Sequence, residues 1–165
     1  MYLSRVQIAN FRGISSLTVT FHKGINVLIG ENTTCKTAVL DALRVCLGLA
    51  LERRDIYIQP EDFFTSPDGK QATSIQFDLT FTDLKQQQHG VFIELLEVAG
   101  DGTIELSLHV RFARDADRIR RTIWGGANDG QEIPFPVLEL LYFTYLGALR
   151  DAARDLSPSR SNRLS

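Results

Sequence analysis

Apolar and polar positions alternate along the start of the chain and predict strands. Residues 2–10 place Val6 and Ile8 on one face and polar side chains on the other, which is the period-two pattern of a strand with one buried face. A second alternating run covers residues 17–21, and a short continuous apolar run follows over residues 25–29. The opening of the chain therefore predicts three strands.

A helix is predicted next, over residues 36–50, because apolar side chains recur there at spacings of three and four. The apolar stripe consists of Val39, Leu40, Leu43, Cys46, Leu47 and Ala50. Asp41 and Arg44 fall on the opposite face. A short loop joins this helix to the apolar run over residues 25–29.

Alternation resumes after residues 51–72, which are expected to be mostly loop. Residues 74–81 predict a strand. Thr82 or Asp83 is a candidate cap for a helix that runs to about Val98.

The second half of the chain predicts a β-hairpin. Residues 103–111 alternate without interruption, residues 115–117 supply a turn, and residues 119–123 alternate on the return. Residues 134–141 are expected to form a short helix or loop, and residues 142–146 a buried strand.

Composition places the chain among ordinary globular domains. With 44% hydrophobic and 23% charged residues, its 165 residues suffice for one domain over residues 1–165. The formal net charge of −2 means that DNA contact requires a local patch. Cys35 and Cys46 have neither metal-ligand nor disulfide spacing, as expected in a reducing cytoplasm. No run resembles a signal peptide or a membrane span, so we expect a cytoplasmic protein without a membrane partner.

The candidate chemistry lies between the third strand and the helix. Gly30, Lys36 and Thr37 match the phosphate-loop pattern of glycine, four residues, then Gly-Lys-Ser/Thr. In such a loop, backbone N–H groups and the helix dipole bind phosphate, the lysine neutralises its charge, and the hydroxyl holds Mg²⁺. The predicted ATP ligands are Gly30, Glu31, Asn32, Thr33, Thr34, Cys35, Lys36 and Thr37, with Thr37 also the Mg²⁺ ligand.

Cys35 departs from this pattern because it stands in the place of the second glycine. We expect a positive φ there, which costs a non-glycine residue on the order of 1–2 kcal/mol. The thiol also occupies space beside the phosphates, so ATP binding should weaken and hydrolysis should weaken more. A strand–turn–helix without nucleotide is the alternative interpretation.

The sequence around this loop resembles the RecF/SMC branch of ABC ATPases. The resemblance is carried by residues 6–14, 26–32 and 36–43. It is most similar to the N-terminal ATPase domain of OLD-family nucleases, which usually read Gly-Glu-Asn-Asn-x-Gly-Lys-Thr, so Thr33 and Cys35 both depart from the common form. Glu61-Asp62-Phe63 and residues 145–151 also look like this family.

The resemblance implies an α/β P-loop ATPase lobe with a mixed sheet and an antiparallel β subdomain. It implies ATP and Mg²⁺ as cofactors, heads that form a homodimer or higher oligomer, and DNA contact through the full-length protein. In OLD proteins a C-terminal Toprim domain cuts DNA, and many members act in defence systems, so a defence-system partner is expected too. The resemblance also brings Arg12 near the nucleotide, as a phosphate or ribose contact; a surface arginine at a turn is the alternative.

The parts that complete ATP hydrolysis are missing from the sequence pattern. No apolar run ends in the Asp-Glu of a Walker B strand, and neither a Leu-Ser-Gly-Gly signature nor a Toprim-like acidic cluster occurs. We expect the phosphate-binding part of a head, cut off in mid-domain, without ATPase or nuclease activity of its own. A disordered tail is the alternative account of the final residues.

Other candidate residues favour structural roles. A solvated hairpin with ion pairs is preferred over DNA contact for Arg111, Arg114, Arg118, Arg120 and Arg121. No metal-ligand spacing surrounds His22, His89 or His109. Trp124 is expected to pack on the hairpin, with base stacking as the alternative. A solvated tail is expected to contain Arg150, Arg154, Arg160 and Arg163.

Three functions stay open at this point. The first is an ATP-binding domain that regulates an OLD-type DNA nuclease. The second is a RecF-like or SMC-like repair head without a nuclease. The third is a non-catalytic module that uses the fold for assembly with partners, which Cys35 favours. A transporter ATPase is disfavoured by the Asn10-Phe11-Arg12 opening.

Overall fold

The computed structural model describes residues 1–31, 35–49, 56–116, 118–127, 129–130, 133–141 and 144. The elements in chain order are β1 (Tyr2–Phe11), β2 (Ile14–Thr20), α1 (Lys36–Leu47), η1 (Pro60–Asp62), β3 (Ser74–Thr82), α2 (Gln86–Val91), η2 (Ile93–Leu95), β4 (Leu96–Val98), β5 (Ile104–Asp115), β6 (Arg118–Gly125) and α3 (Phe135–Glu139). The predicted α/β class is confirmed.

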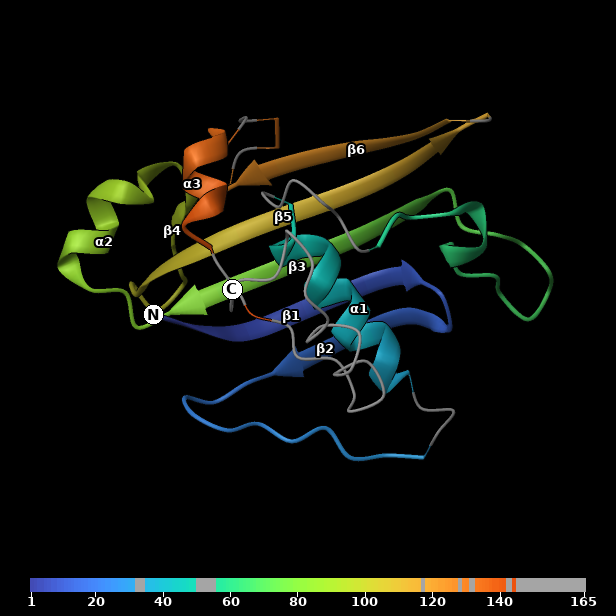
Figure 1. The fold of residues 1–165 in the computed structure, drawn as a ribbon, viewed down its shortest axis with the longest axis horizontal. Helices are drawn as coiled ribbons and strands as arrows, with labels where there is room; N and C mark the ends of the chain where they lie inside the picture. Colours follow the sequence, from blue (N-terminus) through green and yellow to red (C-terminus); the bar gives the residue numbers. More distant parts are fainter. Residues whose placement is uncertain are drawn as a thin grey trace, which may run out of the picture.

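One six-stranded sheet organises these elements (Figure 1). Its order is β2-β1-β3-β5-β4, and β6 pairs with the part of β5 that β4 leaves free. Every pair among the described strands is antiparallel. The antiparallel subdomain is therefore present, whereas the parallel pairing that a mixed sheet requires is absent from this part of the chain.

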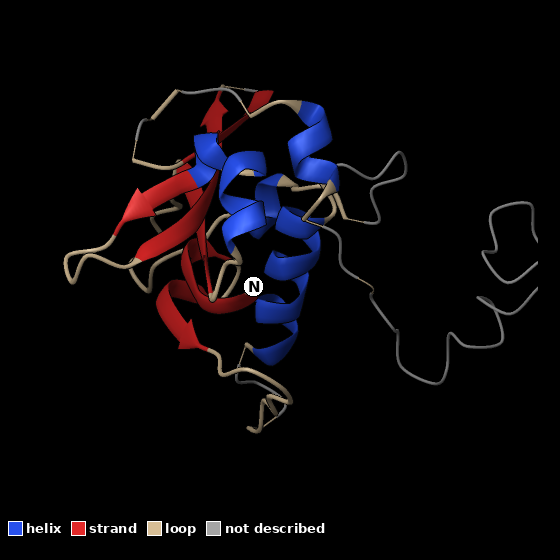
Figure 2. Ribbon diagram, turned by 90° about the vertical axis from the view of Figure 1, so that its left-hand side faces the viewer, coloured by secondary structure: helices blue, strands red, loops and turns tan. Residues whose placement is uncertain are grey.

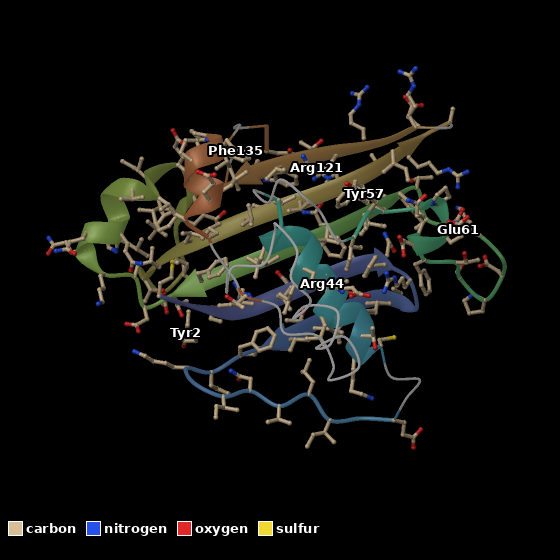
Figure 3. The ribbon with its side chains drawn as sticks, viewed as in Figure 1. Tyr2, Arg44, Tyr57, Glu61, Arg121 and Phe135 are labelled. Carbon is tan, nitrogen blue, oxygen red and sulfur yellow. The ribbon has the colours of Figure 1, made fainter. Side chains whose placement is uncertain are left out.

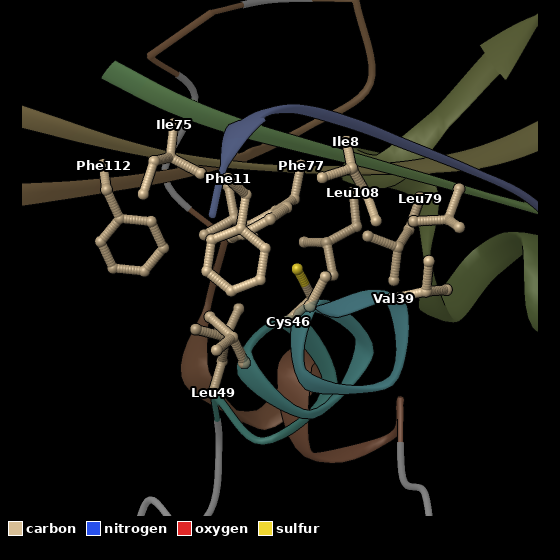
Figure 4. Packing of buried hydrophobic residues seen from close by; sticks show 14 of the residues in the cluster. Ile8, Phe11, Val39, Cys46, Leu49, Ile75, Phe77, Leu79, Leu108 and Phe112 are labelled. Carbon is tan, nitrogen blue, oxygen red and sulfur yellow. The ribbon is translucent and has the colours of Figure 1, made fainter. Parts of the chain in front are cut away.

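The helices gather along one face of the sheet (Figure 2). That face is apolar because the register aligns inward-facing residues across neighbouring strands: Ile8 opposes Phe77, and Phe77 opposes Val110. All three of these side chains are buried. Figure 4 shows the sulfur of Cys46, on α1, pointing at the side chains that the sheet presents.

The buried face of α1 follows the predicted helical spacing but is rotated slightly. Its buried residues are Ala38, Val39, Ala42, Val45 and Cys46. Leu40, which we placed in the stripe, is 45% exposed. The small side chains of the two alanines allow the larger strand residues to fill the space between helix and sheet.

The strand predicted over residues 25–29 is wrong. This segment has no regular secondary structure, and Ile25 and Ile29 are 95% and 90% exposed. A strand needs a neighbour for its backbone hydrogen bonds, and none of the described strands pairs with these residues. The turn before the segment forms as expected, with Gly24 at φ 100°.

The long helix predicted up to Val98 is also wrong at both ends: α2 has Lys85 as its N-cap, not Thr82 or Asp83, and the second half is not helical. Only α2 is helical, and η2 then turns the chain into β4. Leu95 is completely buried, and Leu96 pairs with Leu106 of β5. Burial and strand pairing therefore override helical spacing here. Of the strand predicted over residues 142–146, only residue 144 is described.

The described helices include none that is long and apolar enough to cross a membrane.

Phe77 should be a main determinant of stability. Its ring makes edge contacts with Phe11 and Phe112 at centroid distances of 5.1 and 6.2 Å. Replacing Phe77 with alanine should lower the free energy of unfolding by about 3–5 kcal/mol in urea titrations. The matched control is Ile25→Ala in the exposed segment, expected to change it by less than about 0.5 kcal/mol. Similar losses for both variants would contradict this packing.

Candidate phosphate-binding site

Lys36 closes the predicted phosphate loop onto itself. Its ammonium group donates hydrogen bonds to the backbone carbonyls of Gly30 and Glu31, at the other end of the loop. The two ends of the motif therefore come together, as phosphate binding requires. Asn32, Thr33 and Thr34, the middle of the predicted loop, lie outside the described residues.

The start of α1 is open to an anion. Lys36 is its first residue, no side chain caps it, and its first turn contains no acidic residue. The first N–H groups of a helix have no partners within the helix and carry the positive end of its dipole. Thr37 is exposed in this first turn. Its role as a Mg²⁺ ligand stays a prediction.

Cys35 has the left-handed backbone that we expected of the missing glycine. It is the N-cap of α1, with φ 51° and ψ 9°. An L-residue pays on the order of 1–2 kcal/mol for this conformation. Position 35 thus has a backbone conformation that glycine adopts freely.

The turn between β1 and β2 lies against this cysteine. A Cβ atom added to Gly13 would lie only 3.3 Å from Cys35 Sγ. A side chain at Gly13 would force one of the two to move. Arg12, which precedes it, has φ 50°. The turn that contains this left-handed residue therefore lies close to Cys35, which is left-handed as well.

The guanidinium of Arg12 is held by two aspartates. Its Nε donates to Asp62 Oδ1 at 2.8 Å, and its Nη1 donates to Asp41 Oδ2 at 2.5 Å. Asp41 also accepts a hydrogen bond from Arg44 Nη1 at 3.2 Å. The Arg12 guanidinium lies 4.8 Å from the ring centroid of Phe11, in cation–π geometry.

This environment keeps Arg12 charged. Partial burial acts to lower its pKa, but the hydrogen bonds and charges of Asp62 and Asp41 outweigh that effect and raise it. Two arginines and two aspartates balance one another in this cluster. Arg12 lies at the β1–β2 turn, and its side chain is 33% exposed, but its guanidinium is bound by two aspartates; its role as a nucleotide contact stays a prediction.

Sequence reasoning missed Asp41 and Asp62. Helical spacing set Asp41 on the face away from the core, yet its side chain is only 14% exposed because it turns to Arg12. Asp62 is in η1. A hydrogen bond of 2.6 Å from the Arg12 N–H to the Asp62 carbonyl joins η1 to the turn. Figure 3 shows Arg44 on α1 and Glu61, the neighbour of Asp62, in the segment that follows the helix. The Glu61-Asp62-Phe63 resemblance was the available signal.

A family model described as "Protein of unknown function (DUF2813)" matches residues 1–96, more than half of the chain. The chain belongs to the DUF2813 family.

Relatives of this DUF2813 chain include DNA-repair proteins. It is 43% identical over 53 residues to the DNA replication and repair protein RecF of Streptococcus suis (strain 05ZYH33), 36% over 94 residues to the uncharacterized protein YbjD of Escherichia coli (strain K12), and 34% over 85 residues to the DNA double-strand break repair Rad50 ATPase of Pyrococcus abyssi (strain GE5 / Orsay). These matches cover 32%, 55% and 52% of the chain, but 14%, 16% and 10% of the respective relatives. The chain thus spans less than a fifth of their length.

Solved structures of SMC ATPases share the fold of the DUF2813 chain. One, from work on "ATP-driven dimerization and DNA stimulated activation of SMC ATPases", has a TM-score of 0.63 at 16% identity and covers 97% of this chain and 93% of its own. The Smc head domain of Pyrococcus yayanosii has a TM-score of 0.58 at 19% identity, covering 85% and 25%. The similarity to RecF and Rad50 supports the predicted RecF/SMC-like branch, and the SMC structures share the fold, whereas membership of the OLD nucleases stays a prediction.

Among the hairpin arginines of the DUF2813 chain, Arg111 has several side-chain partners, whereas others are exposed. Arg111 donates to Gln76 at 3.0 Å and pairs with Asp129 at 3.1 Å, and its guanidinium lies 4.7 Å from the centroid of the Trp124 ring. Trp124 is buried and is a packing residue, as expected. The structure leaves Arg118 and Arg120 exposed on β6. Arg150, Arg154, Arg160 and Arg163 lie outside the described residues.

His109 is the centre of a polar cluster on the sheet face opposite α1. Its Nδ1 lies 2.6 Å from Asp78 Oδ1, its Nε2 lies 3.5 Å from Glu97 Oε1, and its ring stacks on Trp124 with centroids 5.1 Å apart. Burial acts to lower the pKa of His109, but the two carboxylates outweigh burial and raise it above its ordinary value of 6.5. Among the described residues no group of three acidic, histidine or cysteine side chains has the arrangement of a metal site.

The His109 cluster should make stability depend on pH. Because the folded pKa is raised, the ion pairs stabilise the fold fully below pH 6.5, the ordinary value, and this contribution is lost as pH rises through the folded pKa. Denaturant titrations should show His109→Gln losing more stability at pH 5.5 than at pH 8.5. His22→Gln, in the exposed segment after β2, is the control. Equal losses at both pH values for His109→Gln would refute this coupling.

Proposed function

We propose that this chain binds the phosphates of Mg–ATP as the N-terminal part of a RecF/Rad50/SMC-type ATPase head that works in DNA processing. The observation that carries this proposal is the closure of the loop by Lys36 at the open start of α1. A lysine at a helix N-terminus, beside the first N–H groups that have no partner within the helix, is the arrangement that binds nucleotide phosphates.

Each residue of the site has a proposed part. The backbone of residues 30–35 surrounds the phosphates, Lys36 neutralises their charge, and the hydroxyl of Thr37 binds Mg²⁺. Arg12 presents a further positive group at the edge of the site. The absence of acidic residues from the first turn of α1 fits an anionic ligand there.

The exposed apolar segment over residues 25–29 supports a role within a larger head. Ile25, Val27 and Ile29 are each more than 70% exposed. A short run of β-branched residues gains stability when a strand pairs with it and apolar side chains cover it. We propose that another part of the whole protein supplies this neighbour together with the residues for hydrolysis, and that the heads then dimerise and reach DNA. The chain alone should bind nucleotide without turning it over.

The names of the relatives favour a repair head over a nuclease regulator. RecF is described as a replication and repair protein and Rad50 as a double-strand break repair ATPase. An OLD-type nuclease with a Toprim domain and a defence-system partner is a narrower form of the same proposal. It is supported by the sequence around Phe63, and a Toprim segment elsewhere in the source gene would decide for it.

A non-catalytic assembly module is the second candidate function. It is favoured by Cys35, whose thiol replaces the bare backbone of glycine at the point nearest the phosphates. In this case the fold would serve as a surface for partner proteins, and the phosphate loop would be a vestige.

Calorimetric titration of the chain with Mg–ATP tests the proposal. The native chain should bind, and Lys36→Ala should weaken binding by at least about tenfold, because a charge-assisted hydrogen bond contributes about 1.5–3 kcal/mol. Cys35→Gly should bind more tightly than the native chain, since glycine takes the left-handed backbone without strain and frees the space of the thiol.

The matched control is Lys23→Ala, which removes an exposed lysine paired with Asp83 at 2.8 Å. It should bind as the native chain does. Binding that appears only in Cys35→Gly would support the assembly module, with a site disabled by the thiol. Failure of every variant to bind, with thermal unfolding unchanged, would refute nucleotide binding by this chain.

A further inference from the structure

We propose that Asp41 and Asp62 are positioning residues of the phosphate site that act through Arg12. The proposal rests on the proposed function, since it concerns the same site, and it assigns roles to two carboxylates that the loop motif does not include. Their task is to fix one guanidinium and, with it, the turn that lies against the phosphate loop.

The two aspartates orient Arg12 by accepting hydrogen bonds from two of the three nitrogens of its guanidinium. Asp62 accepts from Nε and Asp41 accepts from Nη1, at 2.8 and 2.5 Å. Among the described residues Nη2 has no hydrogen-bond partner. A guanidinium is planar, so two bonds on different nitrogens fix the direction of the third. The Nη2 edge is thus held available for an anion, while the carboxylates keep the plane in place.

The ion pairs of Arg12 with Asp41 and Asp62, here called the clamp, join three separate elements. Arg12 belongs to the turn between β1 and β2, Asp41 to α1, and Asp62 to η1. The η1 side has further bonds, because the Phe64 N–H donates to the Asn10 carbonyl at 3.0 Å and the Arg12 N–H donates to the Asp62 carbonyl. The α1 side depends on the ion pair with Asp41. Asp41 is therefore the residue that couples the turn to the helix of the phosphate loop.

This coupling reaches the loop over a short path. Asp41 stands one turn after Thr37 in the same helix, and Gly13, the neighbour of Arg12, approaches Cys35. If the pair between Arg12 and Asp41 is broken, the turn loses one of the contacts that hold it against α1. The Nη2 atom of Arg12 should then lose its fixed direction, and Cys35 should become more accessible to solvent.

The backbone at Arg12 argues for a role of the side chain. Its φ of 50° is one that glycine adopts freely, yet the position holds a long charged residue. Its guanidinium makes two ion pairs, each with an aspartate whose side chain is 14% exposed, and a ring contact with Phe11. The left-handed backbone is thus kept for what the side chain binds.

Nucleotide affinity is the first test. In Mg–ATP titrations, Asp41→Asn and Asp62→Asn should each weaken binding by about threefold to thirtyfold, the range of coupling between residues in one ion-pair network. In the double variant Arg12→Ala with Asp41→Asn, affinity should fall no further than in Arg12→Ala alone. The matched control is Asp129→Asn, which removes the partner of Arg111 far along the chain and should leave affinity unchanged.

Thiol reactivity is the second test and needs no nucleotide. Cys35 is partly exposed and Cys46 is buried, so a disulfide reagent such as Ellman's should form its mixed disulfide with Cys35 first, releasing one thiolate of the reagent. The Cys35 rate should rise at least about threefold in Asp41→Asn and Arg12→Ala, and stay unchanged in Asp129→Asn. The same reaction in a Cys35→Ser variant measures how much of the observed thiol reaction comes from Cys46.

The two measurements separate this inference from the proposed function. Weaker ATP binding together with a faster Cys35 reaction in the aspartate variants supports both. Native affinity and a native thiol rate in those variants overturn the inference and leave the phosphate site standing. A chain that binds no ATP but whose Cys35 rate rises in Asp41→Asn refutes the nucleotide proposal and supports the clamp. If the chain binds no ATP and the Cys35 rate is also unchanged in the aspartate variants, both the proposed function and this inference are overturned.

Discussion

The burial of α1 on one face of an antiparallel sheet is the constraint on which the candidate site depends. Lys36 and Asp41 have fixed positions only because Val39, Ala42 and Cys46, on the same helix, are packed against β1, β3 and β5. The helix also ends the phosphate loop, so packing in the core sets where the loop stops. A twelve-residue helix of this composition would be marginal in isolation. Tertiary contact makes it a rigid base for the site.

Local patterns in the sequence predicted most of this scaffold. Period-two alternation located β1, β2, β3 and the hairpin of β5 and β6 because one face of each strand is buried and the other is polar. The same reasoning failed at residues 25–29, where an apolar run says nothing about whether a neighbour is present to pair with it. It failed again at Leu95 and Leu96, where burial and pairing with β5 replace a helical turn. Local periodicity cannot register such long-range demands.

The candidate site divides in the same way. The loop residues and Arg12 were predicted because they lie within short motifs. The clamp was not, since Arg12 is separated from Asp41 by 29 positions and from Asp62 by 50. Helical spacing predicted Asp41 on the outward face, because the spacing of apolar residues indicates only which side of the helix faces the core. It carries no information on a turn that lies beside the helix. Ion pairs between elements are properties of the fold, and only the three-dimensional arrangement reveals them.

Backbone strain gathers where the turn and the loop meet. Asn10, Arg12 and Cys35 are three of the five described non-glycine residues with positive φ. Each is a cost to folding that the packed core and the hydrogen bonds around η1 offset. Cys35 is the informative member, because the loop keeps a left-handed residue there although glycine is gone. Position 35 therefore has the backbone conformation that a glycine would adopt without strain, and the cysteine adds a thiol there.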